Sequence, residues 1–519
     1  ALTLLAKGYE VTMLDAGVEK PMPVEPQSNF DELRERLADP VAYLLGEKFD
    51  ALTLPGQSGD FYAFPPSKRY VFEQSGPFNF AARGFEPLFS FARGGLAEAW
   101  TGGVYPLNDA ELKEFPFGHA DLAPYYDEVA RRIGINGAAD DLARFFPVHD
   151  HMLNPLKLGN HATALLNAYG QRRDKLNAAG CYFGRSRIAT LTQDKGDRPA
   201  CSYCARCLWG CATGALYTPS SSLRECMKHP NFRYAPNTYV SHFRYDAHRQ
   251  ITAVVTMSTT DGARAEVPTQ QLVLAAGTLS SSRIFLESIY RGTGEVLRLD
   301  GLMDNQQILI PYVNMHAIGA AYDPNSYQFH QVAMGLEGAR PEEYVHSQIT
   351  AMTTALVHPL VQKLPLDLRG ATAVFRSLRS SLGIINVNLH DRRRPQSYLT
   401  IEPGNKDETA KLVIDYVSDP AEAHAIRAVV SRIRGVMLKL GCVVAPGMTH
   451  IRPKGAGVHY AGTVPMSRAA NALRASEHCR SHDFDNLFFV DGTTYPFLPA
   501  KNITFTLMAN AVRVADQVF

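Results

Sequence analysis

The amino-acid sequence predicts an α/β fold of composite α+β type, in which a parallel sheet with helices adjoins an antiparallel sheet backed by helices. The apolar run of residues 272–275 ends at Gly277 and leads into a helix, as buried parallel strands commonly do. Between about residues 305 and 416 the chain holds β-like segments, several of which alternate apolar and polar residues. Such alternation is typical of an antiparallel sheet with one covered face.

The composition narrows the class of protein. A chain of 519 residues is long enough for two domains or one large composite domain, and 45% hydrophobic with 20% charged residues is ordinary for a globular protein. The formal net charge of +1 argues against a nucleic-acid-binding surface. No apolar run approaches the roughly 20 residues of a membrane-spanning helix. We therefore expect no nucleic-acid partner and no transmembrane segment.

The first residues have the pattern of a helix followed by a strand. Residues 1–7 have helical periodicity, and the strand over residues 10–14 ends at Asp15. An acidic residue at this place holds a ribose hydroxyl in Rossmann-like folds, although Asp15 could equally begin a turn with Gly17. The glycine fingerprint that normally precedes such a residue by about 20 positions would fall before Ala1. No secretory signal is visible, which leaves localisation open between cytoplasm and periplasm.

An insertion and a glycine-rich loop follow. Residues 20–75 read as an insertion with one helix near residues 30–37. In the loop over residues 91–109, two glycine pairs bracket Trp100. Glycines permit positive φ and a close backbone approach to a ligand, but a glycine-rich stretch is also simply a loop. Residues 121–133 form an amphipathic helix that we expect to pack against the core.

Four of the eight cysteines are clustered, at Cys201, Cys204, Cys207 and Cys211. Their C-x2-C-x2-C-x3-C spacing is that of an iron–sulfur loop. Four thiolates also satisfy a tetrahedral zinc site, and buried thiols under a glycine turn are a third interpretation. The spacing leaves all three open, and eight cysteines are too few for a disulfide scaffold.

The middle of the chain alternates between strands and helices. A strand is expected over residues 251–257, and Ser280 to Ser282 are placed to cap the helix that opens after Thr278. The helix would begin near Gly277, a geometry that favours anions. Residues 358–382 have helical character, and a long helix is expected between Asp419 and Gly441. The β-like segments between these helices cover residues 308–317, 328–334, 344–352, 383–388, 397–401 and 411–416.

The C-terminal segment, residues 458–519, carries the residues expected to do chemistry. His459 lies beside a small-residue turn, and Asn502 opens the final helix. Between them the apolar strand of residues 487–490 is closed by Asp491 and Gly492. Polar residues on either side of a buried strand, near glycine turns or a helix N-terminus, suit a flavin site that presents an acid/base pair to a substrate.

Five stretches together resemble the glucose–methanol–choline (GMC) FAD-dependent oxidoreductases over nearly the whole chain. They are TMLDAG, ARGGLAEAWTGG, LAAGTLSSSRIFL, VHYAGTVPMS and LFFVDGTTYPFLPAKNITFT. The resemblance implies a Rossmann-like FAD-binding domain and oxidation of a CH–OH group of a sugar, glycoside, polyol or alcohol by hydride transfer to flavin N5. It makes His459 the base that takes the hydroxyl proton and Asn502 the group that hydrogen-bonds the substrate oxygen.

The resemblance also implies the cofactor contacts. Asp15 should meet the adenosine ribose, and the backbone of Val240 should meet adenine. Where some relatives attach FAD covalently through a histidine, this chain has Ala99, so non-covalent FAD is expected. The other expected contacts are Arg93, Gly94, Gly95, Ala97, Trp100, Gly277, Asp491, Gly492, Asn502 and Thr504.

The stretch CLWGCATGALY resembles that of sugar and sugar-acid dehydrogenases, whose flavin subunit carries an iron–sulfur cluster. This implies a small subunit or a cytochrome as electron-accepting partner, whereas other relatives keep a similar turn without a cluster, so both cases stay open. A same-fold flavoenzyme of biosynthetic or non-oxidative chemistry, such as a tailoring oxidase or a lyase, is the alternative enzyme class. A scaffold without activity is the non-enzyme alternative, and it has no need of an aligned base and amide.

The expected domains are discontinuous. Residues 1–150, 200–300 and 455–519 would form the FAD-binding domain, and residues 151–199 and 301–454 the substrate-binding domain. The strands of the second domain carry His330, His346 and His390, which could contact a polar substrate but which we expect to be structural or surface histidines.

Overall fold

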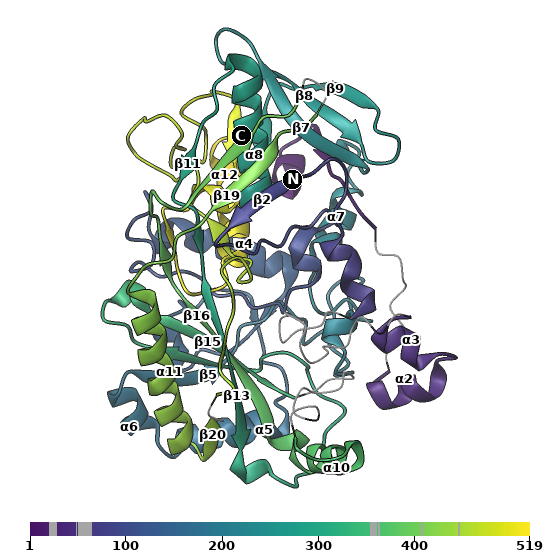
Figure 1. The fold of residues 1–519 in the computed structure, drawn as a ribbon, viewed down its shortest axis with the longest axis vertical. Helices are drawn as coiled ribbons and strands as arrows, with labels where there is room; N and C mark the ends of the chain where they lie inside the picture. The colour runs from purple at the N-terminus through teal and green to yellow at the C-terminus, as the bar shows by residue number, and fades with distance from the viewer. Residues whose placement is uncertain are drawn as a thin grey trace.

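The computed structural model describes residues 1–19, 28–47, 49, 65–352, 361, 364–405, 408–444 and 447–519. The molecule is elongated (Figure 1). Both chain ends lie in its upper half near α8 (Thr278–Thr293) and α12 (Thr504–Gln517), and the largest antiparallel sheet occupies the lower half. The predicted α/β composite fold is confirmed.

Two parallel strand pairs bring together segments that are far apart in the sequence. β1 (Val11–Leu14) pairs with β6 (Phe232–Ala235), and β10 (Leu272–Leu274) pairs with β23 (Leu487–Phe489). β10 leads through Gly277 into α8, as the apolar run predicted. Because parallel strands present their carboxyl ends at one edge, the residues that follow β10 and β23 meet there.

The start of α8 differs from the prediction. Gly277 is the residue before the first turn, and no side chain caps the helix. Ser281 lies inside the first turn, where its hydroxyl donates to Asp491 and accepts from the backbone N–H of Ala276. The serines therefore tie the helix to the strand ends rather than capping it.

A seven-stranded sheet, called the roof sheet below, dominates the lower half. Its path is β20–β13–β16–β15–β14–β5, with β21 also paired to β13, and all its pairings are antiparallel. One face packs in an apolar cluster with α5 (Asn160–Gly170) and α11 (Glu422–Lys439), which confirms the predicted sheet backed by helices. The strands are β5 (Cys181–Arg185), β13 (Gln306–Asn314), β14 (Val332–Leu336), β15 (Val345–Ala351), β16 (Leu382–Leu389), β20 (Cys442–Val444) and β21 (His450–Ile451).

Two of the predicted β-like segments belong to a different sheet. β18 (Tyr398–Glu402) and β19 (Lys411–Asp415) lie in a four-stranded sheet with β11 (Leu299–Asp300) and β2 (Phe80–Arg83). The reason is packing, because the apolar residues of β18 and β19 join the cluster that contains the buried side of α8. β19 pairs in parallel with β2, more than 300 residues earlier in the sequence.

The insertion and the long helix also differ in detail from the prediction. The described part of the insertion holds α2 (Phe30–Arg36), a second helix α3 (Pro40–Leu45) and a 3-10 turn. α11 begins at Glu422 rather than directly after Asp419, because the Asp419 carboxylate accepts the N–H of Ala421 in a preceding turn. The prediction for residues 358–382 lies partly outside the described residues, and its described part holds α10 (Leu368–Leu378).

The remaining elements connect these layers. None of the helices in the described part of the chain has the length and apolarity needed to cross a bilayer. The other helices are α1 (Leu2–Ala6), α4 (His119–Ile133), α6 (Arg173–Ala178) and α7 (Pro219–Cys226). The other strands are β3 (Ile135–Asn136), β4 (Met152–Leu153), β7 (Thr238–Tyr245), β8 (Ile251–Ser258), β9 (Arg264–Pro268), β12 (Met303–Asp304), β17 (Asp391–Arg392), β22 (Tyr460–Ala461) and β24 (Phe497–Leu498).

Candidate active site

His459 and Asn502 lie side by side. His459 directly precedes β22, and Asn502 lies two residues before α12. The Nδ2 atom of Asn502 is 3.4 Å from the Nε2 atom of His459. His459 is buried and Asn502 is half-buried. The two residues chosen from the sequence are therefore neighbours, with an amide N–H directed toward one ring nitrogen.

Asn305, which the sequence did not single out, orients His459. The Nδ2 group of Asn305 donates to the carbonyls of Leu389 (2.8 Å) and Pro499 (3.0 Å), which leaves its Oδ1 as an acceptor. The Nδ1 atom of His459 lies 2.9 Å from that oxygen and must carry the proton. Burial lowers the pKa of His459 to about 4, so the ring is neutral near pH 7. Its Nε2 therefore carries the lone pair and faces Asn502.

Gln348, on β15 of the roof sheet, orients Asn502 in the same way. Its Nε2 donates to the Oδ1 of Asn502 at 2.7 Å. The oxygen of Asn502 is thereby occupied, and its amino group is the end that faces His459. The four side chains form one hydrogen-bonded series in which Asn305 holds His459 and Gln348 holds Asn502.

The residue before Asn502 anchors the segment. The ammonium of Lys501 donates to Glu111 and to the carbonyls of Pro106 (3.0 Å) and Phe145 (2.6 Å). Both Lys501 and Glu111 are buried. Burial lowers the pKa of Lys501 and raises that of Glu111, and their direct contact opposes both shifts. An ion pair at this depth fixes the backbone from which Asn502 projects.

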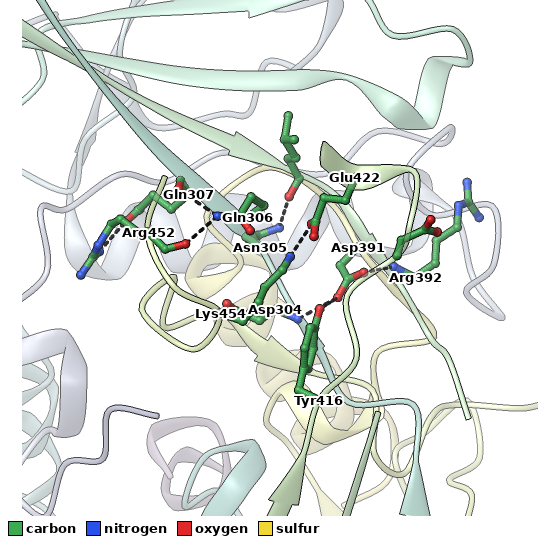
Figure 2. Close-up of polar contacts among 12 residues, drawn as sticks. Asp304, Asn305, Gln306, Gln307, Asp391, Arg392, Tyr416, Glu422, Arg452 and Lys454 are labelled. Carbon is green, nitrogen blue, oxygen red and sulfur yellow. Dashed lines mark hydrogen bonds and ion pairs between the residues drawn. The ribbon is translucent and has the colours of Figure 1, made fainter. Parts of the chain in front are cut away.

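A second polar network surrounds Asp304, the residue before Asn305 (Figure 2). The neighbouring Asp304 accepts the N–H of Gly455 at 2.8 Å, and its own N–H donates to Asp391 at 3.0 Å. The hydroxyl of Tyr416 also donates to Asp391, at 2.6 Å. Burial raises the pKa of Asp304 to about 7. This network joins β12 to the segment that leads into His459.

The glycine-rich loop fits a diphosphate contact. Val18 and Ala92 form a parallel bridge, which places the loop against the segment that follows Asp15. Gly94 and Gly95 have φ values of +98° and +65°, a region that favours glycine. A methyl group built on Gly95 would meet nothing within 4 Å. Bare backbone beside open space at a strand end suits a phosphate group.

Asp15, the expected ribose contact, directly follows β1. Its carboxylate accepts from Tyr234 (2.9 Å) and from the N–H of Gly17 (3.2 Å), and burial raises its pKa. Its carbonyl accepts the N–H of Thr238, at the start of β7, which also carries Val240. Asp15 is therefore hydrogen-bonded to the first residue of the strand that carries Val240, and both were expected at the adenosine end.

Asp491 has a structural role in addition to any cofactor contact. Its carboxylate accepts from the N–H of Gly277 (3.0 Å), from Ser281, and from the N–H and hydroxyl of Thr493 (3.0 and 2.7 Å). A methyl group on Gly492 would lie 2.2 Å from the carbonyl oxygen of Tyr460, so only glycine fits there. Asp491 thus fixes the two turns at the ends of β10 and β23.

The other expected cofactor contacts lie in the glycine-rich loop and at the start of α12. Arg93 forms an ion pair with Glu19 at 3.1 Å, and the Nε1 of Trp100 donates to the carbonyl of Tyr217 at 2.7 Å. Ala97 is in a 3-10 turn (Gly95–Glu98), and Thr504 is the first residue of α12.

The cysteine loop folds around one small cavity. Cys201, Cys204, Cys207 and Cys211 all line it, together with Tyr327 and other neighbours. Burial raises the pKa of Cys201 to about 12 and that of Cys207 above its usual range, so these thiols are protonated without a bound cation. Within the described residues, no three cysteine, histidine or acidic side chains are already positioned as metal ligands.

Parallel strand pairs, a glycine-rich loop and a neutral histidine beside an amide are the arrangement that we expect of an oxidoreductase acting on CH–OH groups. Residues 393–511 match the family model described as GMC oxidoreductase. The chain is 23% identical to 6'''-hydroxyparomomycin C oxidase of Streptomyces lividus, over 78% of this chain and 72% of the relative. It is 24% identical to 2-methyl-1,2-propanediol dehydrogenase of Mycolicibacterium austroafricanum, over 78% and 74%. The chain is similar to GMC oxidoreductases, and the family model matches its C-terminal part.

Solved structures agree on the fold. Pyridoxine 4-oxidase from Mesorbium loti superposes with a TM-score of 0.59 at 15% identity, covering 99% of this chain and 96% of that one. A formate oxidase superposes with a TM-score of 0.59 at 10% identity, covering 99% and 94%.

Proposed function

We propose that this chain oxidises a CH–OH group of a sugar, glycoside, polyol or alcohol, with His459 as the base and Asn502 as the oxygen-binding group. The contact between the Nδ1 of His459 and the Oδ1 of Asn305 carries the proposal. It leaves Nε2 unprotonated and directed to the place where Asn502 presents its amide N–H. A base and a hydrogen-bond donor beside each other can act on the same substrate hydroxyl: the base takes its proton and the donor binds its oxygen.

The proton chemistry follows from these residues. As the substrate O–H bond breaks, its proton forms a new N–H bond at Nε2 of His459, and the developing charge on oxygen is stabilised by the N–H of Asn502. The resulting imidazolium keeps its Nδ1–H bond to Asn305, whose oxygen dipole stabilises the positive charge. Burial of the ring excludes water that would otherwise compete for the proton.

The cofactor of the proposal is non-covalent FAD, which accepts hydride from the carbinol carbon when bound. The open space beside Gly95, the turn at Gly277 and the carboxylate of Asp15 fit its diphosphate and ribose groups. The position of Ala99 offers no side chain that could form a covalent link.

The test is the flavin content and the turnover of the purified protein. We expect flavin absorbance that is released on denaturation, and a loss of about 10²–10⁴-fold in kcat for His459→Ala with flavin retained. The matched control is His424→Ala, because His424 is exposed on α11. Wild-type turnover by His459→Ala would contradict the base assignment, and protein without flavin would contradict the cofactor.

We also infer that the four clustered cysteines bind an iron–sulfur cluster that passes electrons to a small subunit or a cytochrome. Their shared cavity supports this, because all four cysteines line it, and a cluster would have to draw their thiols together, since no three of them lie as metal ligands among the described residues. Two non-glycine residues of the loop, Tyr203 and Ala205, have φ values of +56° and +58°, which indicates a chain bent tightly around that cavity. We expect iron and acid-labile sulfide in protein prepared without oxygen. Zinc without iron would indicate a structural zinc site instead of a cluster. The absence of iron and zinc would indicate buried thiols without a metal.

A further inference from the structure

The roof sheet has a polar face that is buried. On it, His346 lies opposite Asn388, which lies opposite Gln307, and Gln348 lies opposite Asn386 in the next row. Residues opposite each other in adjacent strands share a face. The other face holds the apolar cluster packed on α5 and α11. Burying a face of imidazoles and amides is costly unless their polar atoms find partners.

Several of these atoms have no partner among the described residues. They are Nε2 of His346, Nδ2 of Asn388 and Oδ1 of Asn386. The nearby Nε2 of His330 also has no hydrogen-bond partner among the described residues. His330, His346 and Asn388 are each at most 1% exposed. Buried polar groups are nearly always hydrogen-bonded, so a group of them without protein partners in one place marks where a ligand supplies the partners.

This face adjoins the candidate active site. A methyl group built on Gly103 would lie 2.6 Å from Nε2 of Gln348, 3.2 Å from Oδ1 of Asn502 and 3.2 Å from Nε2 of His330. Asn502, Gln348 on the sheet and His330 are therefore close neighbours around Gly103.

The chemistry of the face selects its ligand. Burial lowers the pKa of His330 to about 3 and that of His346 well below its usual range, so both rings are neutral donors and acceptors. The cation of Arg452 borders the face through Gln307, and Lys501 is already paired with Glu111. No member of the two rows is a carboxylate that could pair with an ammonium group.

We propose that the polar face formed by Gln307, His346, Gln348, Asn386 and Asn388, with His330, binds the non-reacting hydroxyls of a neutral sugar or polyol. The proposal rests on the function proposed above and names the substrate class of the same site. Rows two residues apart on a strand are separated by about 6.6 Å. A substrate that spans them while one carbinol sits at His459 carries hydroxyls on several carbons, which excludes simple alcohols.

The experiment compares matched compounds on the flavin-loaded enzyme. Xylitol is compared with pentanol, and D-glucose with D-glucosamine at about pH 6, where the amine is protonated. Binding is measured by calorimetry on His459→Ala, which keeps the ligand intact, and kcat/KM is measured on the wild type. We expect at least about 10-fold tighter binding of xylitol than of pentanol, and of glucose than of glucosamine.

Substitutions on the polar face test whether its side chains cause the preference for xylitol over pentanol. His346→Leu and Asn388→Leu should each reduce the preference for xylitol over pentanol by about 10-fold, and His346→Gln should recover part of it. His424→Leu, on the exposed side of α11, should leave the preference unchanged, and retained flavin and melting temperature verify folding.

The outcomes separate the two proposals. Binding of pentanol or glucosamine as tight as that of xylitol or glucose would overturn this inference, as would failure of both polyhydroxy compounds to bind. Variants that leave the preference unchanged would also overturn it. Selective binding of xylitol or glucose without oxidation of any compound would support the face and contradict the proposed function instead.

Discussion

The segment that carries His459 and Asn502 and the roof sheet that faces it hold their polar groups in opposite ways. In the segment, the three residues around the candidate base each have a protein partner: His459 contacts Asn305, Asn502 contacts Gln348, and Lys501 contacts Glu111. On the sheet, ring and amide atoms of His346 and Asn388 are buried without a partner among the described residues.

The difference separates two tasks. Groups that move a proton must already be oriented when the substrate arrives, and fixed hydrogen bonds provide that orientation without reorganisation. Groups that recognise a substrate must keep donors and acceptors for it, and the cost of leaving them open is recovered on binding. Changes in the segment should therefore affect the rate, and changes on the sheet should affect the choice of substrate.

The largest effect is expected from breaking the orientation of His459. Asn305→Leu removes the oxygen that fixes the proton on Nδ1, so the ring can present a protonated Nε2 to the substrate. We expect kcat to fall by about 10³-fold, as a wrong tautomer of a catalytic histidine does elsewhere.

Kinetics with retained flavin measure this effect. Asn471→Leu is the matched control, because Asn471 is exposed on a distant loop. A near-normal kcat for Asn305→Leu would mean that His459 is oriented without Asn305, and the contrast between segment and sheet would lose its main support.

A smaller effect is expected where the two regions meet. Gly103→Ala places a methyl group 2.6 Å from Nε2 of Gln348 and 3.2 Å from Oδ1 of Asn502, so the pair must move apart. Displacing an oxygen-binding group by such a distance costs about 10²-fold in kcat/KM.

The matched change is Gly435→Ala, in α11, where an added methyl group meets nothing within 4 Å. It should leave the rate unchanged and stabilise the helix slightly. If Gly103→Ala retained full activity, the position above Gly103 would not belong to the substrate site.

Local patterns and the family resemblance pointed to His459 and Asn502, which lie side by side, but not to the residues that hold them. His459 and Asn502 were found because each stands beside a glycine turn or a helix N-terminus in a recognisable stretch. Asn305, between β12 and β13, and Gln348, on β15, each lie more than 150 residues away from the side chain they hold. Periodicity indicates which face a strand residue lies on, but it does not show which distant side chain it meets.

The same limit explains the errors in the fold. β18 and β19 alternate like the roof strands, but they pair with β11 and β2 and pack against α8, which their sequence does not show. His346 was expected to be structural, because one histidine on a strand carries no sign of an open ring nitrogen. His346 lies opposite Asn388 only in the folded sheet, and the sequence does not show this pairing.

The smallest expected effect is the pH dependence of the wild type. Lowering the pH protonates Nε2 of His459 and removes its lone pair, so the rate must fall as pH decreases. Because burial lowers the pKa of His459 to about 4, kcat/KM should change by less than about 3-fold between pH 7 and 5. An exposed histidine would instead cause a fall near about pH 6.5.

Two variants sharpen the interpretation of the profile. Asn305→Asp places a carboxylate against Nδ1 of His459, which favours the charged ring and should move the acid limb to higher pH. Burial raises the pKa of Asp304 to about 7, so an inflection there belongs to Asp304 if it disappears in Asp304→Asn. If kcat/KM still fell near pH 6.5 in Asp304→Asn, His459 would be hydrated in the working enzyme. The contrast between a closed segment and a sheet that accepts substrate would then be lost.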